Sequence, residues 1–368
     1  MASSTSTSPR PPTQRIRSLD ALRGFDMFWI IGGAELVRGL LDLPHSPSLS
    51  RIGLSLAEHA VWEGLHFYDL VFPLFLFIVG VAVPFSVESR LERGESTGRV
   101  VWRVARRTLL LFILGVLANV VAGGPGLEHV RAPGVLQRLA LGYAFAAVTS
   151  LCLRPRAQAG LTAALLVAYW LILRFIPTPG FPAYSLTPDG NLAGWIDRQV
   201  FLPGQMYESW GDPEGLLSTI PALATALIGV LAGHWLRGAQ PGGRKTLGLI
   251  VAGLACLAVG GVWSLEFPII KRLWTSSYVL VAGGWSLLLL AAFYWTIDVR
   301  GWRRWPLFFV VIGSNAILIY LGQSLIDAFL GEALGWPDWP LAVWVALTLA
   351  AKWAVLAVLH SRRIYLRL

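Results

Sequence analysis

The stretch EHAVWEGLHFYDLVFPLFLFIVG, residues 58 to 80, joins a polar segment with two histidines to a run of apolar residues. That run belongs to an apolar segment of residues 65–88, which as a helix is long enough to cross a bilayer core of about 30 Å. Comparable segments recur along the whole chain, and together they number ten: roughly 19–41, 65–88, 104–122, 132–152, 158–176, 216–236, 245–265, 275–297, 305–326 and 340–360. Since only helices and closed barrels satisfy their own backbone in lipid, each segment is predicted to be a helix.

The composition points to the same class of protein. Of the 368 residues, 55% are hydrophobic and 14% are charged, whereas about a quarter are charged in ordinary soluble domains. We therefore predict an all-α, polytopic membrane bundle of about ten transmembrane helices, with residues 18–368 forming a single transmembrane domain. Residues 1–17 are rich in Ser, Thr and Pro and lack an apolar core, so they are expected to be a disordered cytoplasmic tail rather than a signal peptide.

The basic residues indicate orientation rather than nucleic-acid binding. The net charge is +9, but the cations fall in short clusters between apolar segments instead of on one polar face. Twenty of them fall on one side of the predicted membrane and only five on the other: Arg51, Arg131, Arg198, Lys271 and Arg272. By the positive-inside rule, both termini are predicted to be cytoplasmic, in a multi-pass protein of the cell (inner) membrane.

Two long connections, residues 42–64 and 177–215, are predicted on the outer side, where a polar substrate would be met. The two cysteines, Cys152 and Cys256, both lie in apolar segments, so neither a disulfide framework nor a metal site is expected.

His59, His66 and Asp69 stand at the predicted outer boundary of the second helix. Histidine suits proton transfer because its unperturbed pKa is near 6.5. His66 and Asp69 are three residues apart and would touch on a helix. His59 and Asp69 are ten apart, about 15 Å on an unbroken helix, so they meet only if the chain turns near Gly64. Spacing alone leaves a structural role and a catalytic role open for each histidine.

Arg107, Arg138 and Asn315 are polar side chains in or beside apolar segments, where each needs a partner or a task. Arg107, at the predicted cytoplasmic end of its helix, serves either as an anchor or as a phosphate ligand. Arg138 lies about two turns inside segment 132–152, where its planar guanidinium could reach phosphate oxygens. Asn315, in GSNAILIY, is either part of a site or a bridge between helices.

The predicted outer loops carry a second group of candidates. Asp212 and Glu214 precede the sixth helix and either cap its N-terminus or bind substrate. Trp62 and other outer tryptophans either stack on a sugar ring or belong to the interfacial aromatic belt.

Several motifs together resemble the heparan-α-glucosaminide N-acetyltransferase family, and they run in order over about residues 17–360. The matching stretches are RSLDALRGF (17–25), HAVWEGLHFYDLVFPLFLFIVG (59–80), VRAPGVLQRLALGY (130–143), DPEGLLSTIPALATALIGVLAG (212–233), LWTSSYVL (273–280), IDVRGW (297–302) and GSNAILIY (313–320). The resemblance implies transmembrane transfer of an acetyl group from cytosolic acetyl-CoA to a glucosamine amine on the far side, without a metal.

The resemblance also implies roles for particular residues. His59, in the H-A-x-W-x-G pattern, matches the family's proposed catalytic histidine, and Asp69 matches the acid that would orient it. We expect acetyl-CoA to contact Arg107, Arg138 and Asn315. The amino sugar is expected to contact Trp62, Asp212 and Glu214.

Alternatives stay open at this point. Transfer is either direct, in a ternary complex, or by way of an acetyl-histidine intermediate. The alternative to an acetyltransferase is a carrier for amino sugars such as N-acetylglucosamine. A carrier is expected to have discontinuous helices, whereas an acetyltransferase needs a basic opening for CoA on the cytoplasmic face. The region between Gly32 and His59 differs from the lysosomal enzymes, so glucosamine units of cell wall, capsule, chitin or other glycans are the expected acceptors. The expected partners are this acceptor and the bilayer, with no nucleic acid and with homodimerisation left open.

Overall fold

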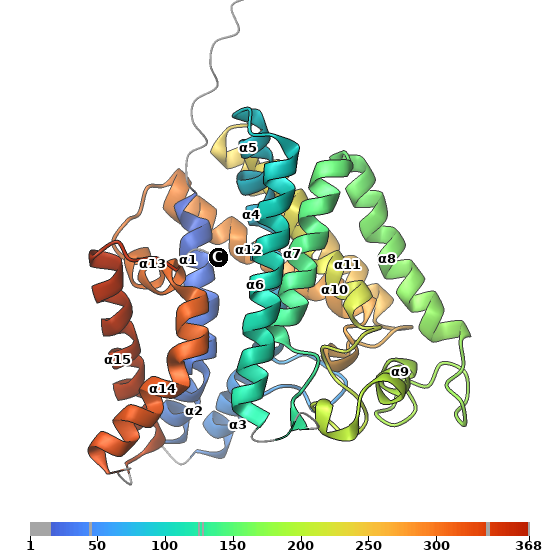
Figure 1. Ribbon diagram of the computed structural model, residues 1–368, viewed down its shortest axis with the longest axis horizontal. Coiled ribbons are helices and arrows are strands. Elements are labelled where there is room, and N and C mark those ends of the chain that lie inside the picture. The colour runs from blue at the N-terminus through green and yellow to red at the C-terminus, as the bar shows by residue number, and fades with distance from the viewer. Residues whose placement is uncertain (1–15, 44–45, 124–125, 127–128, 336–338, 367–368) are drawn as a thin grey trace, which may run out of the picture.

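The computed structural model describes residues 16–43, 46–123, 126, 129–335 and 339–366. Within these ranges the chain is helical and has no named strand, so the predicted all-α membrane fold is confirmed (Figure 1). Most of the predicted tail, residues 1–17, lies outside the described residues, and Arg17 opens the first helix. The helices up to the middle of the chain are α1 (Arg17–Phe28), α2 (Ala34–Asp42), α3 (Pro47–Ala57), α4 (Val71–Val83), α5 (Ser89–Glu92), α6 (Thr97–Gly123), α7 (Val135–Cys152) and α8 (Pro155–Phe175).

The second half of the chain continues in the same way. Its helices are α9 (Leu192–Val200), α10 (Thr219–Arg237), α11 (Gly242–Trp263), α12 (Ser276–Phe293), α13 (Pro306–Ser314), α14 (Ala316–Leu334) and α15 (Leu341–Ser361). Short 3₁₀ turns cover Phe67–Leu70, Pro203–Gln205 and Lys271–Leu273, and π-helical turns cover Trp29–Gly33, Pro84–Glu88 and Tyr294–Val299.

Nine helical stretches among the described residues are long and apolar enough to cross a membrane. The predicted first crossing, 19–41, is not among these nine, and its helix is interrupted. Its α1 and α2 join through the π-helical turn, where Gly32 has a φ of 141° that breaks the helix. A side chain at that backbone angle would be strained, so glycine is required at the bend.

The predicted helix 305–326 is wrong in one respect, because the segment is divided. Asn315, with φ −133° and ψ 38°, separates α13 from α14. At nine residues, α13 is only about 13 Å long, too short to cross, and α14 supplies the crossing. The backbones of α1 and α13 touch, because a Cβ built on Gly24 or on Gly313 would overlap the facing helix. A hydropathy pattern does not register this contact, since the apolar run continues through the break.

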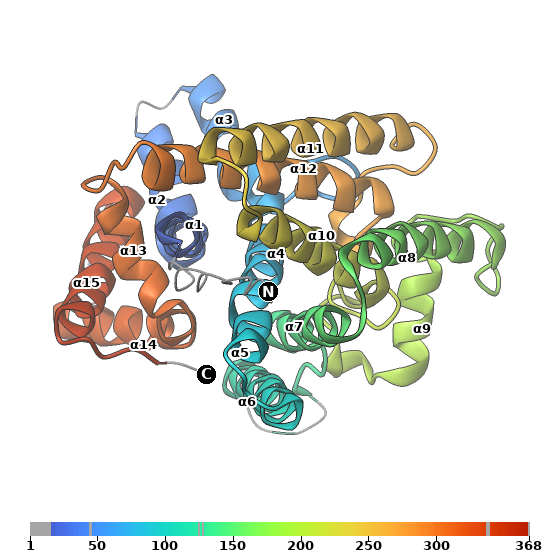
Figure 2. The ribbon, with the colours of Figure 1, turned by 90° about the horizontal axis from the view of Figure 1, so that it is seen from above.

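The core of the bundle is built around α4. Viewed from above, α4 lies between α1, α7, α10 and α12 (Figure 2), and it packs against all four. Its closest neighbour is α10, because Gly80 and Gly229 bring the two backbones together. Close approach at small residues is the usual way in which membrane helices gain packing energy. The helix that follows the His59 loop is thereby fixed in the centre of the protein.

The two ends of the bundle differ. One end, which we call the basic end, is where α1 begins, α5 lies and α15 finishes. The opposite end, the loop end, carries the long connections after α2 and after α8, which contain α3 and α9 (Figure 1). Both termini of the described chain thus lie at the basic end. Its assignment to the cytoplasm stays a prediction from the positive-inside rule, as does the single domain over residues 18–368.

Candidate active site

His59 and Asp69 meet at the loop end. Glu58 ends α3 in an extended conformation, and the residues up to His66 form an irregular loop rather than a helix. The expected turn is present at Gly64, whose φ is +109°. The chain therefore doubles back, and His59 Nδ1 lies 2.8 Å from Asp69 Oδ1.

Asp69 is enclosed and held by three partners. Its side chain has no exposed surface. Oδ2 accepts the backbone N–H groups of His66 at 2.8 Å and Ala60 at 3.2 Å, which leaves Oδ1 for His59. An ionised carboxylate can only accept, so Nδ1 of His59 donates and its Nε2 keeps a free lone pair. Asp69 thereby sets both the tautomer and the orientation of the ring, which stacks on Tyr68 with ring centroids 4.9 Å apart.

Lys271 completes this group from a segment 212 residues away. Its Nζ lies 2.9 Å from both ring nitrogens of His59 and 3.9 Å from Asp69 Oδ1. Burial lowers the pKa of Lys271 to about 8, against the opposing attraction of Asp69. The two segments are tied together, because the backbone N–H of Gly64 donates to Ile269 O at 2.9 Å.

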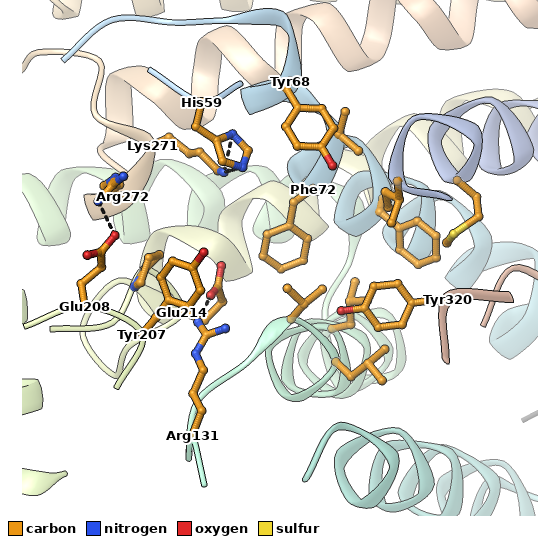
Figure 3. Close-up of a pocket in the computed structure, with 18 of the residues that line it drawn as sticks. His59, Tyr68, Phe72, Arg131, Tyr207, Glu208, Glu214, Lys271, Arg272 and Tyr320 are labelled. Carbon is orange, nitrogen blue, oxygen red and sulfur yellow. Dashed lines mark hydrogen bonds and ion pairs between the residues drawn. The ribbon is translucent and has the colours of Figure 1, made fainter. Parts of the chain in front are cut away.

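These side chains border a cavity of about 330 Å³ (Figure 3). Its interior is apolar and comes from the transmembrane helices: Met27, Ile30, Val71, Phe72, Phe75, Val135, Leu136, Leu139 and Ile317. Its mouth is polar and comes largely from the loops: His59, Tyr68, Arg131, Tyr207, Glu208, Glu214, Lys271 and Arg272. The cavity therefore combines a place for a polar acceptor with an apolar passage toward the middle of the bundle.

The charges at the mouth are largely paired. Arg131 binds Asp212 with two hydrogen bonds of 2.6 and 2.7 Å and also pairs with Glu214. Arg272 binds Glu208 at 2.7 Å. Figure 3 shows the last pair beside Tyr207, near Lys271 and His59. The mouth is thus lined by fixed charges of both signs rather than by a field of one sign.

The three predicted sugar contacts occupy different positions. Glu214 lines the cavity. The Asp212 side chain is fully enclosed and accepts the backbone N–H groups of Tyr207 and Glu214, so it shapes the loop behind the cavity wall. Trp62 donates to Leu186 O at 2.8 Å and packs edge-on against Trp210, which makes it a joint between the two long connections. Trp62 is not among the residues that line the cavity.

A second cavity, of about 500 Å³, opens at the basic end. Arg90, Arg103, Arg106 and Arg107 line it together with Tyr143. The Arg107 guanidinium lies over the Tyr143 ring at 4.4 Å, and its buried Nε has no hydrogen-bond partner among the described residues. A cluster of guanidinium groups of this kind suits a phosphate-bearing ligand.

The structure corrects the grouping of Arg138 with Arg107. Since α7 starts at the loop end, Arg138 lies in its first turn, and it is not among the residues that line the basic-end cavity. Only 2% of Arg138 is exposed, and its guanidinium binds Gly215 O and Ser218 Oγ behind Trp274. It therefore lies behind the wall of the loop-end cavity, and its buried Nε and Nη1 have no hydrogen-bond partner among the described residues.

Asn315 lies at the break between α13 and α14. Its Nδ2 donates to Ile364 O at 3.0 Å, and its Oδ1 accepts from Leu366 N at 2.9 Å. These bonds hold the C-terminal segment, as the bridging alternative expects. Helix α14, which follows Asn315, lines the loop-end cavity with Ile317 and Tyr320 instead.

Sequence reasoning did not assign Lys271, Arg131 or Arg272 to the site, although all three line the cavity. A signal was present, because they are three of the five cations that break the positive-inside pattern. A cation that opposes the topology rule has a local reason to be there, and here the reason is a carboxylate or a histidine.

The fold and the site define a polytopic helical membrane protein in which a buried aspartate holds a partly exposed histidine at the mouth of an amphipathic cavity. No family model matches the sequence. The chain is 32% identical over 327 residues to human heparan-α-glucosaminide N-acetyltransferase, an alignment that covers 74% of this chain and 49% of that protein. The mouse protein of the same name is 31% identical over 327 residues, covering 74% of this chain and 50% of its own length. The chain spans about half the length of these relatives, and the similarity confirms the resemblance to their family that the motifs indicate.

Proposed function

We propose that this chain is a membrane acetyltransferase that takes an acetyl group from acetyl-CoA at the basic end and delivers it to a glucosamine-type amine at the loop end. The observation that carries the proposal is the Asp69 carboxylate, which fixes the His59 ring at the wall of the amphipathic cavity. The names of the two relatives support acetyl transfer to an amino sugar. The positive-inside pattern supports the cytoplasmic side for the basic end and the cell membrane of a bacterium as the location.

In this proposal His59 acts as the base. The sugar amine attacks the acetyl thioester, and Nε2 takes a proton from the nitrogen as the bond to the carbonyl carbon forms. Asp69 compensates the charge that develops on the ring and holds its orientation, as the acid of a catalytic triad does. The enclosed Asp69 side chain is well suited to this, because its hydrogen bonds do not compete with bulk water. The same arrangement serves either direct transfer or an acetyl-histidine route.

The donor route connects the two cavities. On α7, Leu139 lines the loop-end cavity and Tyr143 lines the basic-end cavity, one helical turn apart on the same face. Phe75 on α4 lines the loop-end cavity, and Ser86 in the turn that follows α4 lines the basic-end cavity. Eleven residues of helix separate them, which is about 16 Å. We propose that the CoA phosphates bind Arg107 and its neighbours while the pantetheine arm follows this face toward His59.

The acceptor site lies at the mouth. Tyr68, Tyr207 and Tyr320 are aromatic rings on which a sugar can stack, and Glu208 and Glu214 attract an ammonium group. Since these carboxylates are already paired with arginines, an amino sugar would share them rather than meet free charge. A glucosamine unit of a cell-wall, capsule or other glycan is the proposed acceptor.

The test uses the purified chain in detergent or lipid, with labelled acetyl-CoA and glucosamine. We expect labelled N-acetylglucosamine from the wild type and a loss of about 10²–10⁴-fold in His59→Ala. The matched control is His66→Gln, because the His66 ring makes no contact with His59 among the hydrogen bonds of the described residues and the backbone N–H that holds Asp69 is kept. That variant should lose at most a few-fold. Absence of both acetyl transfer and acetyl-CoA binding across amino-sugar acceptors would refute the proposal.

A carrier for amino sugars is the second candidate, because the structure contains the interrupted helices that a carrier is expected to have. The α1–α2 crossing breaks at Gly32, and α13 and α14 are divided at Asn315. The basic-end cavity supports the enzyme instead, since a neutral sugar has no need of clustered arginines. Uptake of N-acetylglucosamine into proteoliposomes, measured without acetyl-CoA, separates the two. Uptake with no acetylation would favour the carrier.

A further inference from the structure

Lysine is rare in this chain, and one of its lysines lies in the candidate active site. The sequence has 30 Lys and Arg residues, and the lysines among them are Lys245, Lys271 and Lys352. The Lys352 amine is already hydrogen-bonded, because its Nζ donates to Ile31 O and to Asp327, each at 2.9 Å. Lys245 begins α11 at the basic end, away from the loop-end cavity. Lys271 alone among the three lines that cavity.

The Lys271 amine occupies the place that an acceptor amine needs. To pass a proton to His59, an amine must come within about 3 Å of Nε2. Lys271 Nζ is 2.9 Å from this atom and 2.9 Å from Nδ1, so it rests against the ring rather than on one lone pair. Its four-carbon stem has the rotational freedom to bring Nζ onto the free lone pair of Nε2. An incoming sugar amine therefore competes with Lys271 for the same position.

Lys271 is also a better nucleophile than an ordinary lysine. With its pKa lowered to about 8 by burial, about one tenth of Lys271 is neutral at pH 7, against fewer than about one in a thousand for an unperturbed lysine. Only 14% of its side chain is exposed, so the amine faces the cavity rather than bulk water. Reactivity and position thus coincide at one residue.

We propose that Lys271 is an internal acetyl acceptor, and that the protein acetylates it when acetyl-CoA is bound and no sugar amine occupies the mouth. This inference rests on the proposed acetyltransferase function. The neutral Nζ attacks the thioester carbonyl carbon, and the C–N bond forms as the C–S bond breaks. His59 takes the proton from the nitrogen and passes it to the thiolate, so the products are N-acetyl-Lys271 and CoA as its free thiol.

The modification has a consequence for the site. N-Acetyl-Lys271 has lost its positive charge beside Asp69, and the added acetyl group fills the space next to His59. Because an amide is stable to hydrolysis at neutral pH, the modified protein stays blocked. Free acceptor would protect the protein, and exhaustion of acceptor would switch it off.

The experiment is mass spectrometry of the full-length purified protein after incubation with acetyl-CoA alone, followed by peptide mapping. We expect one added acetyl group per chain, at Lys271, and at least tenfold less of it when saturating glucosamine is present. Lys271→Arg, which keeps the charge but not the nucleophile, should not gain the group. His59→Ala should gain it at least tenfold more slowly. Lys245→Arg is the matched control and should be acetylated at Lys271 like the wild type.

The outcomes separate this inference from the function on which it rests. Transfer to glucosamine together with an unmodified Lys271 would overturn the inference and leave the acetyltransferase standing. Equal acetylation of Lys271 in the wild type and His59→Ala would also overturn it, because the reaction would then be simple chemical acylation. Absence of acetyl transfer both to glucosamine and to Lys271 would overturn the proposed function, and the inference with it.

Discussion

The two cavities of this protein hold their charges differently. At the loop end, Arg131 and Arg272 are each bound to carboxylates of the chain, and Lys271 lies beside Asp69. At the basic end Arg90 and Arg103 share the carboxylate of Glu95, but Arg107 keeps a buried Nε that no described residue accepts. The arginines that line the first cavity have carboxylate partners without a ligand, whereas Arg107 at the second would gain a hydrogen bond from an anion.

This difference suggests how a single bundle can serve two unlike substrates. In the proposed function, a mouth whose charges are paired selects its acceptor by shape and stacking rather than by charge. An arginine cluster binds phosphate strongly but has little specificity of its own.

The largest effect is expected for Asp69→Asn. The amide can donate to Nδ1 of His59 and so favours the tautomer whose Nε2 carries a proton. We expect kcat for acetylation of glucosamine to fall by about 10²–10⁴-fold, with little change in acetyl-CoA binding at the other cavity. Asp189→Asn, an exposed aspartate in a connection at the same end, is the control. A loss of less than threefold in Asp69→Asn would contradict the role given to this carboxylate.

Removing Arg131 should break the charge balance at the mouth. In Arg131→Ala the enclosed carboxylate of Asp212 loses its two charged hydrogen bonds. A buried charge without its partner costs about 3 kcal/mol or more, so the midpoint of chemical or thermal unfolding should fall clearly. Arg51→Ala, an exposed arginine at the same end, should change stability by no more than about 0.5 kcal/mol. Equal stabilities of the two variants would show that the balance at the mouth is not structural.

Self-acetylation of Lys271 should depend steeply on pH. Burial lowers the pKa of Lys271 to about 8, while Asp69 and Glu214 oppose that shift and Arg272 adds to it. A cation with a lowered pKa loses its proton as the pH rises, so the neutral fraction grows from about one hundredth at pH 6 to about one half at pH 8. The initial rate, measured by mass spectrometry, should therefore rise about fifty-fold over this range and level off above it. The His59 ring faces the same amine. A flat profile would contradict the assignment.

A smaller effect, confined to the donor, is expected for Arg107→Ala. Loss of one charge-assisted contact to a phosphate costs about 1.5 kcal/mol, so KM for acetyl-CoA should rise about tenfold while kcat is kept. Raised salt should weaken acetyl-CoA binding in the wild type for the same reason. Arg362→Ala, exposed at the end of α15, is the matched control. An unchanged KM would place the CoA phosphates elsewhere and remove the contrast between the cavities.

Hydropathy was sufficient for most of the fold because crossing a bilayer depends mainly on length and apolarity. It failed where backbone contacts decide the path. The break at Asn315 lies inside a continuous apolar run, and α13 stays against α1 because Gly24 and Gly313 allow the two backbones to touch. Glycine is common in membrane helices, so the hydropathy pattern by itself does not show which glycines lie at a contact between two helix backbones.

The site divides in the same way. The meeting of His59 and Asp69 could be expected once a turn at Gly64 was allowed, since both residues belong to one short stretch. Lys271 could not be expected there, because 212 residues separate it from His59. Arg138 shows the opposite error, in which a basic residue suited to phosphate proves to be enclosed behind Trp274.

The amino-acid order by itself determined that the chain is a helical membrane bundle, where most of its apolar helices lie, and which short stretch contains both His59 and Asp69. These properties follow from local length, apolarity and charge, which are sums over neighbouring residues. Only the tertiary structure decided which cations line the mouth, which arginine remains open to an anion, and which amine rests against His59. Those outcomes depend on how distant helices pack, and packing is set by the fit of surfaces that the linear order does not place together.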